Sequence, residues 1–403
     1  MTIPPFFSRL LPIIFFLSLA LLSFLLNFNG LYGQDAHEYL RQSQVVFDRL
    51  QGLPIPPPSI GDAEFAGGYP LAGALLRFLL GDSVLALQVV SWLAAALGLW
   101  VFERLLHLLA PGVRADSRWA FAGLGLLLAP MFLRAGLSSM SDGLGLAFVL
   151  AAFFFGLRAF ENSRAADVAM AAVFAALAVS TRYSLAALLL PLATALACFL
   201  FSRKKWLAVA GAVCACSVAL LPHFWLKMGV SENPLGHSLL QGWSFLNFFK
   251  ATFQNQSGTI SHLLPNCLYL LFPIAHPAFC LALPGLFFLF KKTDLTLPAK
   301  KILLACIAAY LILLGGLPHQ NSRYLLPAYA LLLLLLFPAW DRLYCYGFLF
   351  FRRLTTGVLA TVLALQLFCC ARILAPILAR HRLEIEVASK LKETMPPDAT
   401  LFA

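Results

Sequence analysis

The sequence predicts an all-α integral membrane protein with about eleven transmembrane helices, and three observations support this prediction. First, the 403 residues are 61% hydrophobic and only 12% charged, whereas soluble domains carry about 25% charged residues. Second, long apolar runs recur along the chain, and about 20 apolar residues are enough to cross a bilayer as a helix. Third, these runs show no two-residue alternation, which favours helices over the strands of a membrane barrel.

The apolar runs place the predicted spans in order along the chain. The first run follows Arg9, and no small-residue cleavage site comes after it, so we interpret it as a retained span and not as a signal peptide. The predicted spans are residues 10–27, 84–106, 119–134, 142–160, 166–181, 183–201, 206–225, 263–290, 298–316, 325–340 and 354–376.

The basic residues predict the orientation of these spans. With the N-terminus in the cytoplasm, more than half of the 29 Lys and Arg residues fall in short cytoplasmic segments, as the positive-inside rule expects. The formal net charge of +11 therefore has a topological explanation, which includes contact with anionic membrane lipids. No basic patch with interleaved aromatic residues is present, so we expect no nucleic-acid partner.

Three longer regions fall on the predicted outer side of a transmembrane domain of residues 1–376. They are a first outer loop at 28–83, a second at 226–262 and a short C-terminal tail at 377–403. In the first loop, residues 34–50 have apolar side chains at helical spacing and predict an amphipathic helix at the membrane surface. Residues 69–80 are too few to span the membrane, so this stretch is expected to re-enter the bilayer or to lie on its surface.

The cysteines do not predict a metal centre. Most of the nine cysteines lie inside apolar runs, and no Cys-x-x-Cys pair occurs. Small buried thiols are therefore expected, and not a disulfide framework or a zinc site. We expect no metal ion and no other cofactor.

Two groups of acidic residues lie where predicted spans reach the outer side. Asp35 and Glu38 are three residues apart and share a helix face, with Tyr39 beside them. Asp142 begins the span at 142–160. Carboxylates in such places can accept a proton from a hydroxyl. The alternative is that they are ordinary helix-start acids, which interact with free backbone N–H groups.

Two groups of cationic and aromatic residues lie at the same boundary. Arg323 has His319 and Tyr324 close in sequence, and Arg182 is followed by Tyr183. A guanidinium binds a phosphate through two parallel hydrogen bonds. The alternative is that these arginines only extend toward lipid headgroups.

All four groups fall on one predicted face of the membrane. Acids for a hydroxyl together with cations for a phosphate are the groups that sugar transfer from a lipid phosphate requires. We therefore take Asp35 and Asp142 as candidate catalytic residues. The candidate substrate-binding residues are Glu38, Tyr39, Tyr69, Arg182, Tyr183, His319, Arg323 and Tyr324.

Several short motifs carry a resemblance to a known family. They are Asp-Ala-His-Glu-Tyr at 35–39, the stretch 67–106, Met-Ser-Asp-Gly at 140–143, and the Arg-Tyr element within 322–335. In their order and sidedness they resemble the C-type (GT-C) membrane glycosyltransferases, specifically the protein mannosyltransferase and aminoarabinose transferase group. Two features depart from that family: Ala36 stands where many members have a second acid, and only residues 377–403 follow the last predicted span.

The resemblance implies an inverting, metal-independent transfer of a sugar from a polyprenyl-phosphate-linked donor to an acceptor hydroxyl at the outer face. It implies that Asp35 corresponds to the catalytic acid of the first loop, that Asp142 matches the acid before the fourth span, and that Arg323 with Tyr324 matches the Arg-Tyr element. The expected partners are the donor lipid, membrane lipids and a glycan, lipid or protein acceptor. The expected location is the plasma (inner) membrane of a bacterium.

Two other functions remain open at the level of sequence. A transporter or flippase of a lipid-linked or glycan substrate would place charges or broken helices near the middle of the bilayer, and the predicted spans are largely free of such charges. A non-catalytic assembly subunit would tolerate the loss of Asp35.

Overall fold

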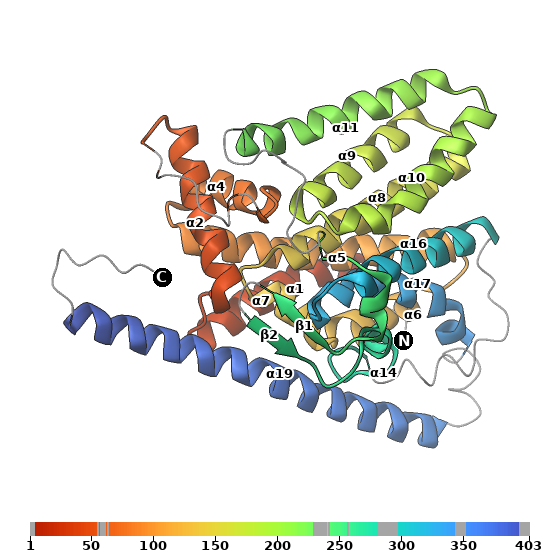
Figure 1. Ribbon diagram of the computed structural model, residues 1–403. Coiled ribbons are helices and arrows are strands. Elements are labelled where there is room, and N and C mark those ends of the chain that lie inside the picture. The colour runs from red at the N-terminus through yellow and green to blue at the C-terminus, as the bar shows by residue number, and fades with distance from the viewer. Residues whose placement is uncertain are drawn as a thin grey trace.

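The computed structural model is built mainly from helices (Figure 1). It describes residues 5–54, 56, 62, 64–228, 240, 242–255, 258–280, 297–342 and 352–394. Within these ranges seven helices are long and apolar enough to cross a membrane, or eight if one bent pair is counted as a span. The all-α membrane fold is therefore confirmed, but the count of eleven spans is not.

The described residues of the first part of the chain include the helices α1 (Pro5–Leu25), α2 (Gly33–Leu50), α4 (Gly68–Leu80) and α5 (Ser83–Leu109). The predicted amphipathic helix at 34–50 is confirmed by α2, which packs against α4. The turn from α4 into α5 follows from local chemistry. Gly81 ends α4 in the left-handed conformation, and the Asp82 carboxylate accepts a hydrogen bond from the backbone N–H of Leu85 (2.6 Å).

The predicted span at 119–134 is broken. It consists of α6 (Ala115–Ala122), a π-helical turn (Gly123–Leu127) and α7 (Pro130–Leu137), and the two halves meet at an angle of 76°. Pro130 has no N–H donor and stands in the first turn of α7, where a helix tolerates proline. The apolar composition of this stretch concealed the bend.

The next four helices form a connected group: α8 (Ser141–Asn162), α9 (Ala165–Thr181), α10 (Leu185–Ser202) and α11 (Trp206–Lys227). Helix α9 packs against both α8 and α11, and α8 packs against α5. Helix α5 and helix α8 are mostly buried, whereas α11 is mostly exposed and presents apolar side chains outward. This distribution is expected for a bundle whose outer helices face lipid.

The predicted span at 263–290 is wrong in its described part. A 3₁₀ turn (Phe245–Phe249) and a hairpin of β1 (Thr252–Asn255) with β2 (Gly258–Ser261) precede two four-residue helices, α13 (Asn266–Tyr269) and α14 (Phe272–Ala275). Residues 281–290 lie outside the described residues. Pro265, Pro273 and Pro277 each remove a backbone donor within a short stretch, which disfavours one continuous helix here.

The last part contains α16 (Leu297–Gly316), a 3₁₀ turn η3 (Ser322–Leu325), α17 (Leu326–Arg342) and α19 (Arg352–Thr394). Helix α19 runs along one side of the molecule (Figure 1) and packs against α7. Residues 377–394, which we assigned to an outer tail, continue this helix without a break. Near its end, His381 Nδ1 lies 2.9 Å from the carbonyl oxygen of Leu31, so α19 supports the connection that leads into α2.

Candidate functional site

Two carboxylates and two guanidiniums form one connected cluster. Arg323 donates a hydrogen bond to Asp35, and Arg182 donates one to Asp142. Arg323 also approaches Asp142, with Nη1 4.0 Å from Oδ2, so the two pairs are linked. The structure therefore brings together four residues that the sequence placed on one membrane face, although they are far apart in the chain.

Each of these residues stands where a helix begins or ends. Asp35 lies in the first turn of α2 and Asp142 in the first turn of α8. Arg182 follows the last residue of α9 in extended conformation, with φ −160° and ψ 112°. Arg323 lies in η3, where the Asn321 side chain accepts a hydrogen bond from the Arg323 backbone N–H (3.3 Å). A short connection joins the end of α8 to the start of α9 and the two helices pack side by side, so the start of α8 meets the end of α9.

The Tyr324 ring contacts the guanidiniums of both Arg182 and Arg323. Its ring centroid lies 4.2 Å from Cζ of Arg182 and 5.4 Å from Cζ of Arg323. A guanidinium is attracted to an aromatic face by the ring quadrupole. The Arg-Tyr element therefore supplies both a cation and the aromatic surface that aligns a second cation.

Two buried tyrosines fix the backbone beneath this element. The Tyr310 hydroxyl donates to the carbonyl oxygen of Tyr324 (2.9 Å), and the Tyr269 hydroxyl donates to that of Asn321 (2.6 Å). Sequence reasoning missed both residues because each lies in an apolar run. The available signal was the hydroxyl itself, since a buried tyrosine usually finds a hydrogen-bond partner.

The cluster is largely shielded from solvent, but unevenly. The Asp142 side chain is 5% exposed, and those of Arg182 and Arg323 are each 12% exposed, whereas Asp35 is 31% exposed. Charges interact more strongly in such surroundings than in water. Burial alone would lower the pKa of Arg182, but the Asp142 carboxylate together with Tyr310 and Tyr324 outweighs it and holds that pKa above its ordinary value. Asp35 is the carboxylate that an incoming molecule can reach.

Tyr39 in α2 and Tyr69 in α4 pack next to the cluster. The Tyr39 hydroxyl lies 2.8 Å from Oγ of Ser141, the residue before Asp142. The two tyrosine rings meet edge to face at 5.1 Å. Tyr69 is fully buried, and its hydroxyl bonds the Leu87 carbonyl (2.9 Å) and Ser91 Oγ (2.8 Å). Tyr69 therefore positions Tyr39 and does not line an open space.

Glu38 belongs to a different network from Asp35. Its carboxylate pairs with Arg41 (2.7 Å) and accepts a hydrogen bond from the Gln42 side chain (2.9 Å). Arg41 bridges from Glu38 to Asp62. The three-residue spacing correctly placed Glu38 near Asp35 on α2, but the basic residue three positions later in the chain attracts its carboxylate.

His319 and Tyr183 lie at the edges of the cluster. The His319 ring is 6.0 Å from that of Tyr324 and 6.3 Å from that of His262. Burial, together with the nearby His262 and Arg323, lowers the pKa of His319, so its imidazole is neutral at pH 7. The Tyr183 hydroxyl lies 3.4 Å from Nε2 of His223.

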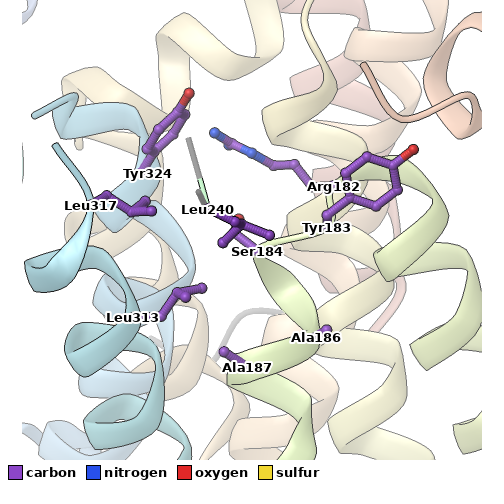
Figure 2. A pocket seen from close by; sticks show the side chains of 9 residues that line it. All are labelled: Arg182, Tyr183, Ser184, Ala186, Ala187, Leu240, Leu313, Leu317 and Tyr324. Carbon is purple, nitrogen blue, oxygen red and sulfur yellow. The ribbon is translucent and has the colours of Figure 1, made fainter. Parts of the chain in front are cut away.

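An apolar pocket of about 270 Å³ opens beside the cluster. Figure 2 shows Arg182 and Tyr324 at one end of it, with Leu313, Ala186 and Ala187 at the other. Ser184 and Leu317 line the space between. The pocket therefore combines a cationic and aromatic head with an apolar interior between α10 and α16.

The described residues contain no group of three or more His, Cys, Asp or Glu side chains arranged to hold a metal ion. The charged side chain that lines the pocket is that of Arg182.

Comparison with known proteins supports the fold prediction. No family model matches the chain, and no curated protein matches it in sequence. The crystal structure of ArnT from Cupriavidus metallidurans bound to undecaprenyl phosphate matches with a TM-score of 0.66 and 16% identity, over 96% of this chain and 82% of that one. The same protein in the apo state matches with a TM-score of 0.56 and 19% identity, over 83% and 61%. ArnT is an aminoarabinose transferase of the GT-C class, so the chain has the fold of a GT-C membrane glycosyltransferase.

Proposed function

We propose that the protein is an inverting membrane glycosyltransferase, which moves a sugar from a polyprenyl-phosphate-linked donor to an acceptor hydroxyl. The observation that carries this proposal is the Asp35–Arg323–Asp142–Arg182 cluster, whose Arg182 lines one end of an apolar pocket. It offers a reachable carboxylate for a hydroxyl and two guanidiniums for a phosphate, next to a space for a hydrocarbon chain.

The pocket fits the first part of an isoprenoid phosphate. Arg182 and Arg323 would bind the phosphate oxygens, because guanidiniums match phosphate geometry through paired N–H donors. The leucine and alanine side chains between α10 and α16 would contact the hydrocarbon. The ArnT neighbour with the same fold was crystallised with undecaprenyl phosphate, which supports a donor of this class.

Asp35 is proposed as the general base. The acceptor oxygen attacks the anomeric carbon of the sugar while its proton passes to the Asp35 carboxylate. The bond between the anomeric carbon and the phosphate oxygen breaks, and its electron pair stays on the phosphate. Attack opposite to the leaving phosphate inverts the anomeric centre. The two guanidiniums stabilise the charge that develops on the phosphate.

The Arg323–Asp35 hydrogen bond requires the donor to bind before Asp35 can act as a base. A donor phosphate competes with Asp35 for the Arg323 guanidinium, and its binding loosens the carboxylate. Asp142, buried between Arg182 and Arg323, keeps both guanidiniums aligned. Asp35 therefore becomes a free base only when the donor is present.

The reaction is proposed to occur on the non-cytoplasmic face of a bacterial inner membrane. This placement rests on the distribution of Lys and Arg over the predicted loops. Asp35, Asp142 and Arg182 belong to segments that this orientation assigns to the outer side, and Arg323 contacts Asp35.

The function can be tested with the protein in proteoliposomes. Each assay contains one undecaprenyl-phosphate-linked sugar, radiolabelled in the sugar, as donor and a bacterial envelope extract as acceptor. We expect label to move from the lipid to an acceptor with inverted anomeric configuration, and undecaprenyl phosphate to be released. Absence of both transfer and undecaprenyl phosphate binding, in folded protein, would contradict the proposal. The orientation is tested separately by cysteine labelling at position 35 from the outside of intact cells.

A further inference from the structure

Arg134, a charged residue near the cluster, has no acidic partner in the part of the chain that the structure describes. It lies in α7, and its guanidinium stands over the Tyr32 ring, 5.4 Å from Cζ to the centroid. Among the described residues it forms no salt bridge, and its Nε atom is buried without a hydrogen-bond partner. An unpaired buried polar group is costly in a native protein and requires an explanation.

Arg134 acts on the same charges as the cluster. Its electrostatic neighbours are Arg323, Asp142, Tyr32 and Asp35. The strongest interaction is the unfavourable one with Arg323. Two like charges therefore interact, and among the described residues Arg134 has no salt bridge of its own that would neutralise the second charge.

Two further polar atoms are unsatisfied among the described residues. The Ser138 hydroxyl, just after α7, and the Nε atom of Arg323 are buried without a hydrogen-bond partner. Met140, two residues after Ser138, contacts Arg323 through its sulfur atom (3.0 Å from Nη1). Donors without acceptors in and beside the cluster indicate a ligand that supplies the missing acceptors.

The charge balance indicates what this ligand is. Three guanidiniums, of Arg134, Arg182 and Arg323, face two carboxylates, of Asp35 and Asp142, so one positive charge is in excess. A sugar-linked lipid phosphate is a diester and carries one negative charge, which would neutralise that excess. After transfer the phosphate is a monoester with almost two negative charges, but Asp35 has then accepted a proton. The assembly stays neutral throughout only if Arg134 is counted.

We propose that Arg134 is a third phosphate-binding residue, whose unpaired charge is reserved for the donor phosphate and for the second charge that the phosphate gains on leaving. This inference rests on the proposed function. Tyr32 orients the Arg134 guanidinium, and Asp142 and the Tyr324 ring keep Arg323 in place when the donor phosphate displaces Asp35.

The test measures binding of undecaprenyl phosphate to the full-length protein in nanodiscs. Arg134→Gln is expected to weaken binding about tenfold, the loss expected for one charge-assisted hydrogen bond. Arg134→Lys should recover most of the affinity because it restores the charge. The matched control is Arg203→Gln, which removes an exposed arginine that also stands over an aromatic ring, that of Phe199.

A double variant tests whether the net charge of the cluster, and not the shape of the Arg134 side chain, determines the affinity for the phosphate. Asp35→Asn combined with Arg134→Gln restores the single excess positive charge, so it should bind undecaprenyl phosphate more tightly than Arg134→Gln alone. Wild-type affinity in Arg134→Gln, or no gain in the double variant, overturns the role of Arg134 while leaving the proposed function intact. If the wild-type protein itself does not bind undecaprenyl phosphate, the proposed function fails and the role of Arg134 fails with it.

Discussion

Arg323 in η3 donates a hydrogen bond to Asp35 in α2, across 288 positions of the chain. This contact joins the proposed phosphate-binding group to the proposed base. Asp142 Oδ2 lies 4.0 Å from Nη1 of the same guanidinium. Donor binding to Arg323 therefore affects the ion pairs of both carboxylates.

Arg182→Lys tests the need for a planar cation beside Tyr324. An ammonium keeps the positive charge but cannot make paired hydrogen bonds or stack on the ring in the same way. We expect transfer efficiency to fall about tenfold or more while the protein stays folded. Arg203→Lys is the matched control and should leave the rate unchanged. A wild-type rate in Arg182→Lys would show that only the charge matters.

Asp142→Asn tests the proposed role of Asp142 in holding the guanidiniums. Removal of one member of a buried ion pair leaves the other charge without compensation and typically costs about 3–5 kcal/mol. We therefore expect a clear drop in the thermal unfolding midpoint in detergent. Asp82→Asn, at an exposed helix start where asparagine also caps well, should change little. The double variant Asp142→Asn/Arg182→Gln should be more stable than Asp142→Asn alone, and a further loss would argue against direct coupling.

The lowered pKa of His319 predicts that the stability of the folded protein depends on pH. Its pKa in the folded protein is lowered by burial and by the neighbouring cations, whereas an unfolded histidine titrates at about 6.5. Below about pH 6.5 the unfolded chain binds a proton that the folded protein does not, so stability falls with pH until the folded pKa is reached. Unfolding midpoints between pH 7.5 and 5 should show this fall, and His319→Gln should reduce it. An equal fall in both proteins would assign the effect to other groups.

Chelation by EDTA should leave transfer unchanged. The described residues provide no metal-binding group of acids, histidines or cysteines, and the proposed site stabilises phosphate through guanidiniums. Transfer measured with EDTA and then with added Mg²⁺ or Mn²⁺ checks this expectation. Activity that is lost with EDTA and restored by one cation would show that the phosphate is bound through a metal ion.

Much of the site could be predicted because charge in an apolar sequence is conspicuous. Asp35, Asp142, Arg182 and Arg323 stand at the ends of apolar runs, and a shared membrane face brings such ends together. Their pairing could not be predicted, because it depends on the extended backbone at Arg182 and on the packing of η3 beside α2. Glu38 was grouped with Asp35 by spacing, but Arg41 turns its carboxylate into another network.

The limits of the fold prediction follow from the same composition. An apolar run such as 263–280 satisfies a hydropathy criterion even when prolines divide it into short helices. The bend between α6 and α7 is likewise invisible to hydropathy, although it positions Arg134. Tyr269 and Tyr310 stayed hidden because a tyrosine in an apolar run has the appearance of a core residue.

The most direct measurement is the rate of sugar transfer by Asp35→Asn at saturating donor, beside undecaprenyl phosphate binding by the same variant. Loss of a general base lowers a rate by on the order of 100-fold or more, and asparagine cannot accept the proton. The account predicts such a loss in rate with undecaprenyl phosphate binding kept or improved, because Asp35 no longer competes for Arg323, and wild-type behaviour for Asp82→Asn. Transfer by Asp35→Asn at the wild-type rate would contradict the account.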